Sequence, residues 1–204
     1  MTTWTATSFL GGHPALDFVN TVGGRTKDRS VEWLREFADA ADWARAARIL
    51  DNAEHEYLLA RAEGAHAEAS EALTDLRAQR EALHDFLLAA IEDTDCPAMV
   101  RKRVEVDIAT AHREAHLSDR YRTQPAWVTD VAELGLRVLA VRVALASAAL
   151  LASDERFQIG ACGRCSWLYL DPSPSRRRRW CSMATCGNRA KAERHQRRSD
   201  VGGR

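Results

Sequence analysis

Four of the chain's five cysteines lie in two close pairs near its C-terminal end. Cys162-Gly-Arg-Cys165 is followed, after fifteen residues, by Cys181-Ser-Met-Ala-Thr-Cys186. A zinc ion prefers four soft ligands in a tetrahedron, and two short loops with two thiolates each supply them. The spacing therefore predicts one structural Zn²⁺ per chain, held by Cys162, Cys165, Cys181 and Cys186, with no open coordination position for catalysis.

Two other interpretations of the cysteine cluster stay open at this point. The four side chains are compatible with unliganded core cysteines, or with a redox switch that releases zinc on oxidation. The fifth, Cys96, precedes Pro97 far from the cluster and is expected to be a plain loop or core residue.

Charge is distributed very unevenly along the chain. Residues 161–204 hold eleven Lys/Arg and three Asp/Glu, a net charge of +8, and the first 160 residues carry −8 because the whole chain sums to zero. Such asymmetry between two parts of a chain suggests a nucleic-acid or acidic partner for the basic part. The same asymmetry also allows the basic part to dock on its own acidic body.

Composition indicates a cytoplasmic chain with one ordinary domain and a small appended one. The 204 residues are 46% hydrophobic, which is enough to bury a core. An odd number of cysteines, four of them clustered, favours metal binding in a reducing compartment over disulfides. Met1-Thr-Thr-Trp does not resemble a signal peptide. We expect no membrane segment, because the most apolar stretch, 131–152, contains charged residues.

Hydrophobic periodicity predicts a mainly α N-terminal domain over residues 1–152. The clearest amphipathic helix spans 67–91, and further helices are expected over about 98–115 and 129–152. Shorter helices are expected after Ser30, Asp39 and Asn52, each a candidate N-cap. The predicted core includes Trp33, Phe37, Trp43, Leu76, Leu83, Phe86, Leu87 and Leu139. A hairpin is expected within 117–128, around Tyr121, Pro125 and Trp127.

Residues 157–199 are predicted to form a zinc-ribbon-like finger, in which a short β-hairpin precedes a basic helix. Segments 157–161 and 167–170 flank the first cysteine pair as two strands would, and an arginine-rich helix follows Cys186. The finger and the helical body are expected to have separate cores, and residues 200–204 to form a disordered tail.

Two basic segments in the finger are candidates for nucleic-acid contacts. Lys191, Arg194 and Arg198 recur at intervals of three and four, so they share one face of the final helix with His195. A second basic patch precedes Cys181. The predicted nucleic-acid-binding residues are Arg176, Arg177, Arg178, Arg179, Asn188, Arg189, Lys191, Arg194 and Arg198. Asn188 and Arg189 are candidates either to bind bases or to support the zinc loop.

Three polar residues, Asp17, Asn20 and Thr21, interrupt an apolar segment near the start of the chain. They are candidates to line a small-molecule pocket in the body. The alternative is that they act as helix caps and turn hydrogen-bond partners.

Two motif sets resemble known families. The tail motifs Cys162-x2-Cys165, Trp167-x-Tyr-x-Asp171, Arg178-Arg-Trp180-Cys181-Ser and Cys186-Gly-Asn-Arg-Ala-Lys191 resemble the CGNR zinc finger. The body motif Gly12-x3-Leu16-Asp-Phe-Val-Asn-Thr21 is similar to the ABATE domain that precedes this finger. The resemblance implies a stress-induced transcription regulator with zinc in the finger and DNA as the target, and it carries no known catalytic residue.

The leading hypothesis is therefore a zinc-dependent DNA-binding regulator whose helical body senses a signal or forms a homodimer. One alternative is a protein-interaction module whose basic finger docks an acidic partner or its own body. A second alternative is an enzyme in the helical domain, although the sequence shows no phosphate-binding glycine loop or nucleophile–base motif.

Overall fold

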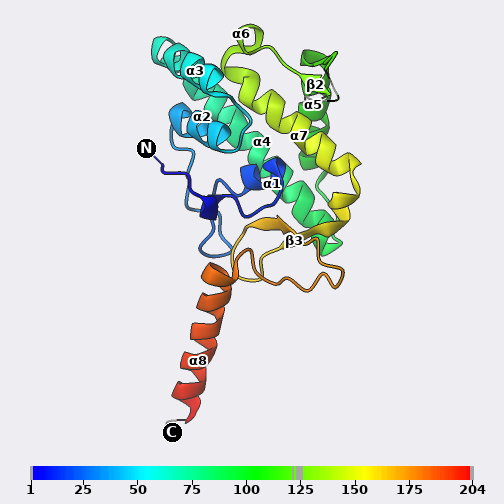
Figure 1. The fold of residues 1–204 in the computed structure, drawn as a ribbon. Coiled ribbons are helices and arrows are strands. Elements are labelled where there is room, and N and C mark those ends of the chain that lie inside the picture. The colour runs from blue at the N-terminus through cyan, green and yellow to red at the C-terminus, as the bar shows by residue number, and fades with distance from the viewer. Residues whose placement is uncertain (1, 121, 123–125, 203–204) are drawn as a thin grey trace.

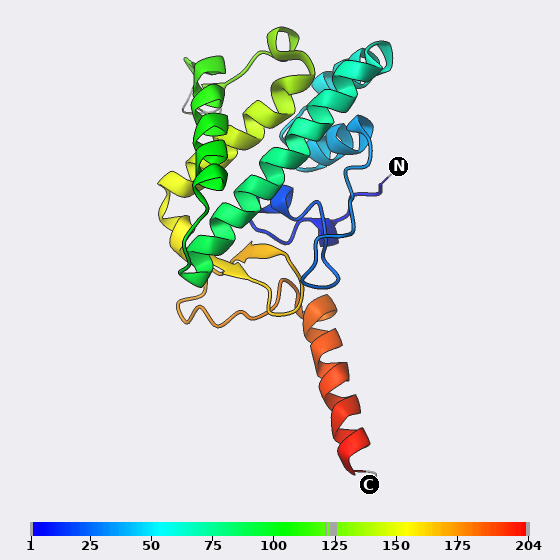
Figure 2. The ribbon, with the colours of Figure 1, turned by 180° about the vertical axis from the view of Figure 1, so that it is seen from behind.

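The computed structural model describes residues 2–120, 122 and 126–202, and within the last helix it describes side chains up to Arg197. A helical body is joined to a small finger, from which one long helix projects (Figures 1 and 2). The prediction of a mainly α chain with a small zinc-ribbon-like finger is confirmed. The body comprises α1 (Pro14–Val19), α2 (Phe37–Ala46), α3 (Asn52–Gly64), α4 (His66–Glu92), α5 (Ala98–Glu114), α6 (Val131–Leu134) and α7 (Val138–Ala152).

The long helix α4 forms where the periodicity predicted it. Leu73, Leu76, Leu83 and Leu87 face the core, at the spacing of three and four that places side chains on one side of a helix. The helix ends at Asp93, which adopts a left-handed conformation with φ 52° and precedes Pro97. Of the predicted core residues, Trp33 and Phe86 are half-buried, and the others are buried.

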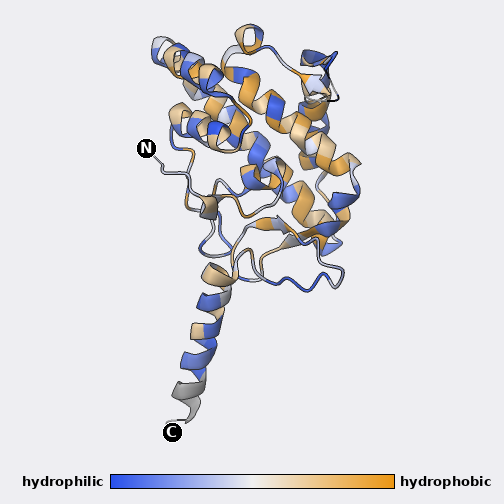
Figure 3. Ribbon diagram, in the orientation of Figure 1, coloured by the Kyte–Doolittle hydropathy of each residue, from blue (hydrophilic) through white to orange (hydrophobic). Residues whose placement is uncertain are grey.

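Helix α7 lies at the centre of the bundle, against α1, α4 and α5. By length and composition alone, Val131–Ala152 is apolar enough to cross a membrane. In this fold the stretch is interrupted at Gly135, where φ is 54°. Most residues of α7 are hydrophobic (Figure 3), and those buried in the body include Val138, Leu139, Val141, Val143, Ala144 and Leu150. Arg142 of α7 forms hydrogen bonds of 2.6 and 2.7 Å to Glu54. These contacts are those of a core helix.

A short antiparallel pair, β1 (His116–Leu117) and β2 (Trp127–Val128), follows α5. Leu117 pairs with Trp127, as expected for a hairpin over this segment. The predicted turn residues Tyr121 and Pro125 lie outside the described residues.

The helix predicted after Ser30 is absent. Residues 20–33, which we call the joint loop, fold back on themselves: Gly23 N–H donates to Val31 O at 2.8 Å, and Trp33 N–H donates to Thr21 O at 3.2 Å. Arg80 of α4 holds this loop through hydrogen bonds of 2.7 and 2.6 Å to Glu32. The backbone hydrogen bonds of the loop pair N–H and C=O groups that would otherwise pair within a helix.

The finger contains an antiparallel pair, β3 (Ile159–Ala161) and β4 (Leu168–Leu170), then a π-helical turn, η4 (Met183–Gly187), and the basic helix α8 (Asn188–Gly202). Both strands lie within the predicted segments. Helix α8 continues to Gly202, beyond the predicted start of a disordered tail at residue 200, and residues 203–204 lie outside the described part.

Candidate metal centre and nucleic-acid interface

The finger brings the four predicted cysteines together. Their sulfur atoms lie within 4.8 Å of one another, and all four side chains are buried. The Sγ–Sγ distance is 3.7 Å between Cys165 and Cys181 and 3.6 Å between Cys181 and Cys186. A tetrahedral zinc ion with bonds of about 2.3 Å requires sulfur atoms about 3.8 Å apart. The cluster therefore fits one structural zinc ion with four thiolate ligands.

The electrostatics of the four thiols also favour a cation at their centre. Hydrogen bonds with Cys165 and Cys181 lower the pKa of Cys162. A hydrogen bond with Cys162 and burial raise the pKa of Cys165, and hydrogen bonds with Cys162 and Cys165, together with burial, raise the pKa of Cys181. Four buried thiols this close together cannot all ionise unless a positive charge compensates them. A bound zinc ion supplies that charge and stabilises all four as thiolates.

Backbone hydrogen bonds fix the two cysteine loops. Cys162 N–H donates to Trp167 O at 2.9 Å, and Gly163 N–H donates to Arg179 O at 2.9 Å. Lys27 of the joint loop donates from Nζ to Cys162 O at 2.5 Å. A cation from the body therefore lies next to the first cysteine loop.

Asn20 binds the finger directly to the body. Its side-chain Nδ2 donates to Leu168 O at 2.8 Å, and its Oδ1 accepts from Leu168 N–H at 2.9 Å. The side-chain amide thus pairs with the β4 backbone as a neighbouring strand would. Beside it, Leu170 N–H donates to Gly11 O at 2.8 Å.

The double glycine of the joint loop permits a close approach to the finger. Gly23 and Gly24 have φ values of 77° and 90°, in the region that favours glycine. A Cβ atom at Gly23 would lie 2.2 Å from Ser166 Oγ, and one at Gly24 would lie 2.8 Å from the Trp167 ring. Trp167 Nε1 donates to Val22 O at 3.0 Å across the same contact.

Asp17 and Thr21, the other two candidate pocket residues, also bind the chain's own groups. Asp17 Oδ1 accepts from Gly11 N–H at 2.8 Å, and Thr21 Oγ1 donates to Phe18 O at 2.7 Å. Arg80 donates to Thr21 Oγ1 at 3.2 Å. These contacts are the caps and turn hydrogen bonds of the alternative interpretation, and with Asn20 they build the joint between body and finger.

Asp17 makes the stability of this joint dependent on pH. Burial raises the pKa of Asp17 to about 6, although the Gly11 hydrogen bond opposes this rise. A carboxyl whose pKa is higher in the folded state stabilises the fold at low pH, and this contribution is lost as the pH rises from about 4 through about 6. At pH 7.5 we therefore expect Asp17→Asn to raise the free energy of unfolding by on the order of 2–3 kcal/mol.

Chemical denaturation of wild type and variant between pH 4 and 8 tests this effect, and the difference should widen with pH. Asp28→Asn is the opposite control, because hydrogen bonds from Thr26 and Ser30 lower the pKa of Asp28. Its difference from wild type should have the reverse sign. A pH-independent difference for Asp17→Asn would contradict the assignment.

The expectation of separate cores is wrong. Leu168 and Leu170 of β4 belong to the same buried cluster as Leu16, Phe18 and Val143 of the body. The four cysteines and Tyr169 form a second, smaller cluster around the metal centre. Strand β4 alternates between these clusters because successive side chains of a strand point to opposite faces. One strand therefore belongs to both cores.

Helix α8 projects from the metal centre away from the body (Figures 1 and 2). Asn188 supports its first turn by donating from Nδ2 to Ala184 O at 3.2 Å. Arg164, between the first two cysteines, donates to Glu193 at 2.6 Å and ties the helix to that loop. From Lys191 to Arg197 every residue is exposed. The described part of α8 is therefore not covered by the acidic body.

Comparison with family models accounts for both parts of the chain. The CGNR zinc finger model matches residues 158–199. The ABATE model, described as "Putative stress-induced transcription regulator", matches residues 12–154, which is more than half of the chain. The chain belongs to the ABATE family. A comparison with curated proteins found no match. The chain thus combines a helical ABATE domain with a finger whose four cysteines fit one structural zinc.

The four consecutive arginines of the ABATE protein differ in their contacts. Arg178 donates to four backbone carbonyls: Trp180 O at 3.0 Å, Leu170 O at 2.9 Å, Leu10 O at 3.4 Å and Cys181 O. Its guanidinium also lies 4.1 Å from the centre of the Tyr169 ring. Arg176 donates to Phe157 O at 2.9 Å. All four arginines are exposed, but Arg178 binds carbonyls across the finger, whereas the Arg179 guanidinium lies 5.4 Å from the centre of the Trp180 ring.

The sequence did not identify several residues of the joint. His84 of α4 is buried, and its Nε2 lies 3.1 Å from Ser166 O, so this nitrogen carries the proton. Burial and the nearby Arg29 lower the pKa of His84, and hydrogen bonds with Asp85 and Ser166 oppose this shift. The local signals for the joint were Gly23-Gly24, since adjacent glycines often mark a close backbone approach, and the polar residues that interrupt the preceding apolar segment.

Proposed function

We propose that this ABATE protein is a cytoplasmic DNA-binding transcription regulator. In this proposal the finger contacts DNA, and the helical body senses a signal or mediates homodimerisation. The observation that carries this proposal is the placement of α8. This basic helix is exposed, begins directly after the cysteine cluster, and points away from the body (Figure 1). No catalytic role is part of the proposal.

Charge supports duplex DNA as the partner. The finger segment 161–204 carries a net charge of +8. Two of its three acidic residues are occupied within the finger, because Glu193 pairs with Arg164 and Asp171 accepts from Ser173 and Arg178. Exposed cations are thus left to neutralise phosphates and release condensed counterions. The body carries −8 and would repel a polyanion, so a projecting helix reduces that repulsion.

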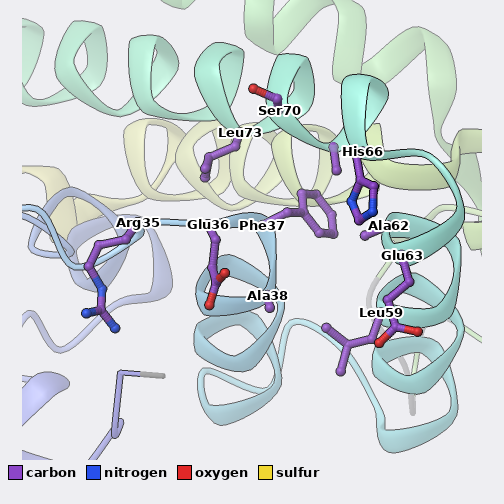
Figure 4. Close-up of a pocket in the computed structure, with 11 residues that line it drawn as sticks. Arg35, Glu36, Phe37, Ala38, Leu59, Ala62, Glu63, His66, Ser70 and Leu73 are labelled. Atoms are coloured by element: carbon purple, nitrogen blue, oxygen red, sulfur yellow. The ribbon is translucent and has the colours of Figure 1, made fainter.

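The body offers surface hollows for a signal molecule. One, of about 440 Å³, lies between α2, α3 and the start of α4, where Phe37, His66 and Leu73 line it (Figure 4). Another, of about 530 Å³, lies between α4, α5 and α7. Both are of the size that small ligands occupy. Neither involves Asp17, Asn20 or Thr21.

The test is the salt dependence of duplex binding by the full chain. If about 4–6 phosphates are neutralised, log K should fall with log salt with a slope of about −4 to −5. Lys191→Ala and Arg194→Ala should each weaken binding to all sequences and flatten that slope by about one. Fluorescence anisotropy of a labelled 30-bp duplex, titrated over a range of salt concentrations, measures the slope.

Lys102→Ala is the matched control, because Lys102 is an exposed cation on α5 of the acidic body. It should leave the slope unchanged. Salt-insensitive or absent duplex binding by the zinc-loaded wild type would overturn the proposal. Salt-sensitive binding to an acidic protein but not to duplex would favour the protein-interaction alternative.

A further inference from the structure

An exposed apolar side chain lies among the arginines at the base of α8. Met183, the first residue of η4, is 65% exposed. It lines a surface hollow of about 380 Å³, whose other lining residues are Arg177, Arg178, Arg179, Trp180 and Ser182. The walls formed by Met183 and Trp180 are apolar, while the guanidinium groups are cationic. A site that bound phosphate alone would not need the apolar walls.

The metal centre fixes the position of Met183. The zinc ligands Cys181 and Cys186 stand two residues before it and three residues after it. Gly187 N–H donates to Ser182 O at 3.0 Å, which closes the turn around Met183. The Met183 side chain lies against Gly187, where an added Cβ would be 2.7 Å from Met183 Sδ. The zinc-anchored turn therefore holds the Met183 side chain, which is normally flexible, beside the arginine side chains.

We propose that Met183 contacts the bases of duplex DNA, while Arg177 and Arg179 contact the flanking phosphates. This inference rests on the proposed DNA-binding function and assigns a separate role within it. Apolar side chains bind DNA through the thymine methyl group or by wedging between base steps, and both contacts depend on sequence. Charge complementarity argues for DNA at this hollow, because its cationic rim attracts the polyanion that brings bases within reach of Met183.

The experiment begins with wild-type protein and a pool of random-sequence 30-bp duplexes. Competition between the most enriched duplex and the unselected pool gives a preference ratio. Met183→Gln keeps the length of the side chain but removes its apolar character, so it should lower this ratio about tenfold. The slope of log K against log salt should stay unchanged, because no charge is lost. Met183→Leu should retain most of the preference.

Met99→Gln is the matched control, since Met99 is 82% exposed but lies on the body, at the start of α5. It should not change the preference ratio. Zinc content and melting temperature establish that each variant is folded. An unchanged preference ratio in the folded Met183→Gln variant would overturn the inference, and so would a changed salt slope in that variant. The inference would also fail if the wild type bound duplexes in a salt-sensitive way but enriched no sequence. Wild type without salt-sensitive binding would instead reject the proposed function itself.

Discussion

Replacing Cys181 by Ser should abolish zinc binding and unfold the finger. Cys181 contacts both Cys165 and Cys186 through sulfur, so its loss leaves three buried thiolates with an incomplete tetrahedron. Structural zinc in fingers is worth about 10–16 kcal/mol of folding free energy in isolated peptides, far more than a single hydrogen bond. Metal analysis should give one zinc per wild-type chain and none in the variant.

The same substitution should also destabilise the helical body, because Leu168 and Leu170 complete its core. Loss of their packing should lower the melting temperature of the helical signal measured by circular dichroism. Cys96→Ser is the control, since Cys96 lies outside the cluster, and it should change neither zinc content nor melting. A variant that loses zinc while the body melts as in wild type would mean that the body's core is independent of β4.

Arg178→Ala should destabilise the fold, unlike substitution of its neighbours. The guanidinium binds carbonyls on both sides of the finger, including Leu170 O of β4 and Cys181 O at the metal centre. Hydrogen bonds from charged groups contribute about 1.5–3 kcal/mol each, but water can replace several of them at this exposed site. We expect a loss of about 2–4 kcal/mol in the free energy of unfolding, together with weaker zinc retention against a chelator.

Arg177→Ala and Arg179→Ala serve as the comparison for Arg178→Ala. Both remove the same charge from exposed positions, so they should leave unfolding nearly unchanged and flatten the salt slope of DNA binding by about one each. Equal stability of all three variants would show that the Arg178 contacts contribute little. Such an outcome would return Arg178 to the group of phosphate-binding candidates.

Short-range sequence patterns were enough to predict the metal ligands, the long helix α4 and the elements of the finger. The cysteine spacing identified the metal ligands, because each pair must come from one short loop. The three- and four-residue periodicity located α4, since its apolar stripe spans many turns and admits no other regular structure. The finger strands and the basic helix were also predicted, because both are close in sequence to the cysteines that order them.

Only the tertiary structure decided how the two parts meet. Asn20 and Leu168 are 148 residues apart, and nothing in either local sequence specifies their pairing. A helix was predicted after Ser30, at the end of the joint loop, because Trp33, Leu34 and Phe37 have helical spacing. Contacts with α4 and the finger determine the course of the loop instead. Arg178 is indistinguishable by sequence from Arg177 and Arg179. The fold alone places carbonyl groups around the Arg178 guanidinium and the Trp180 ring beside that of Arg179. Side-chain roles in a run of identical residues depend on what the chain brings next to each one.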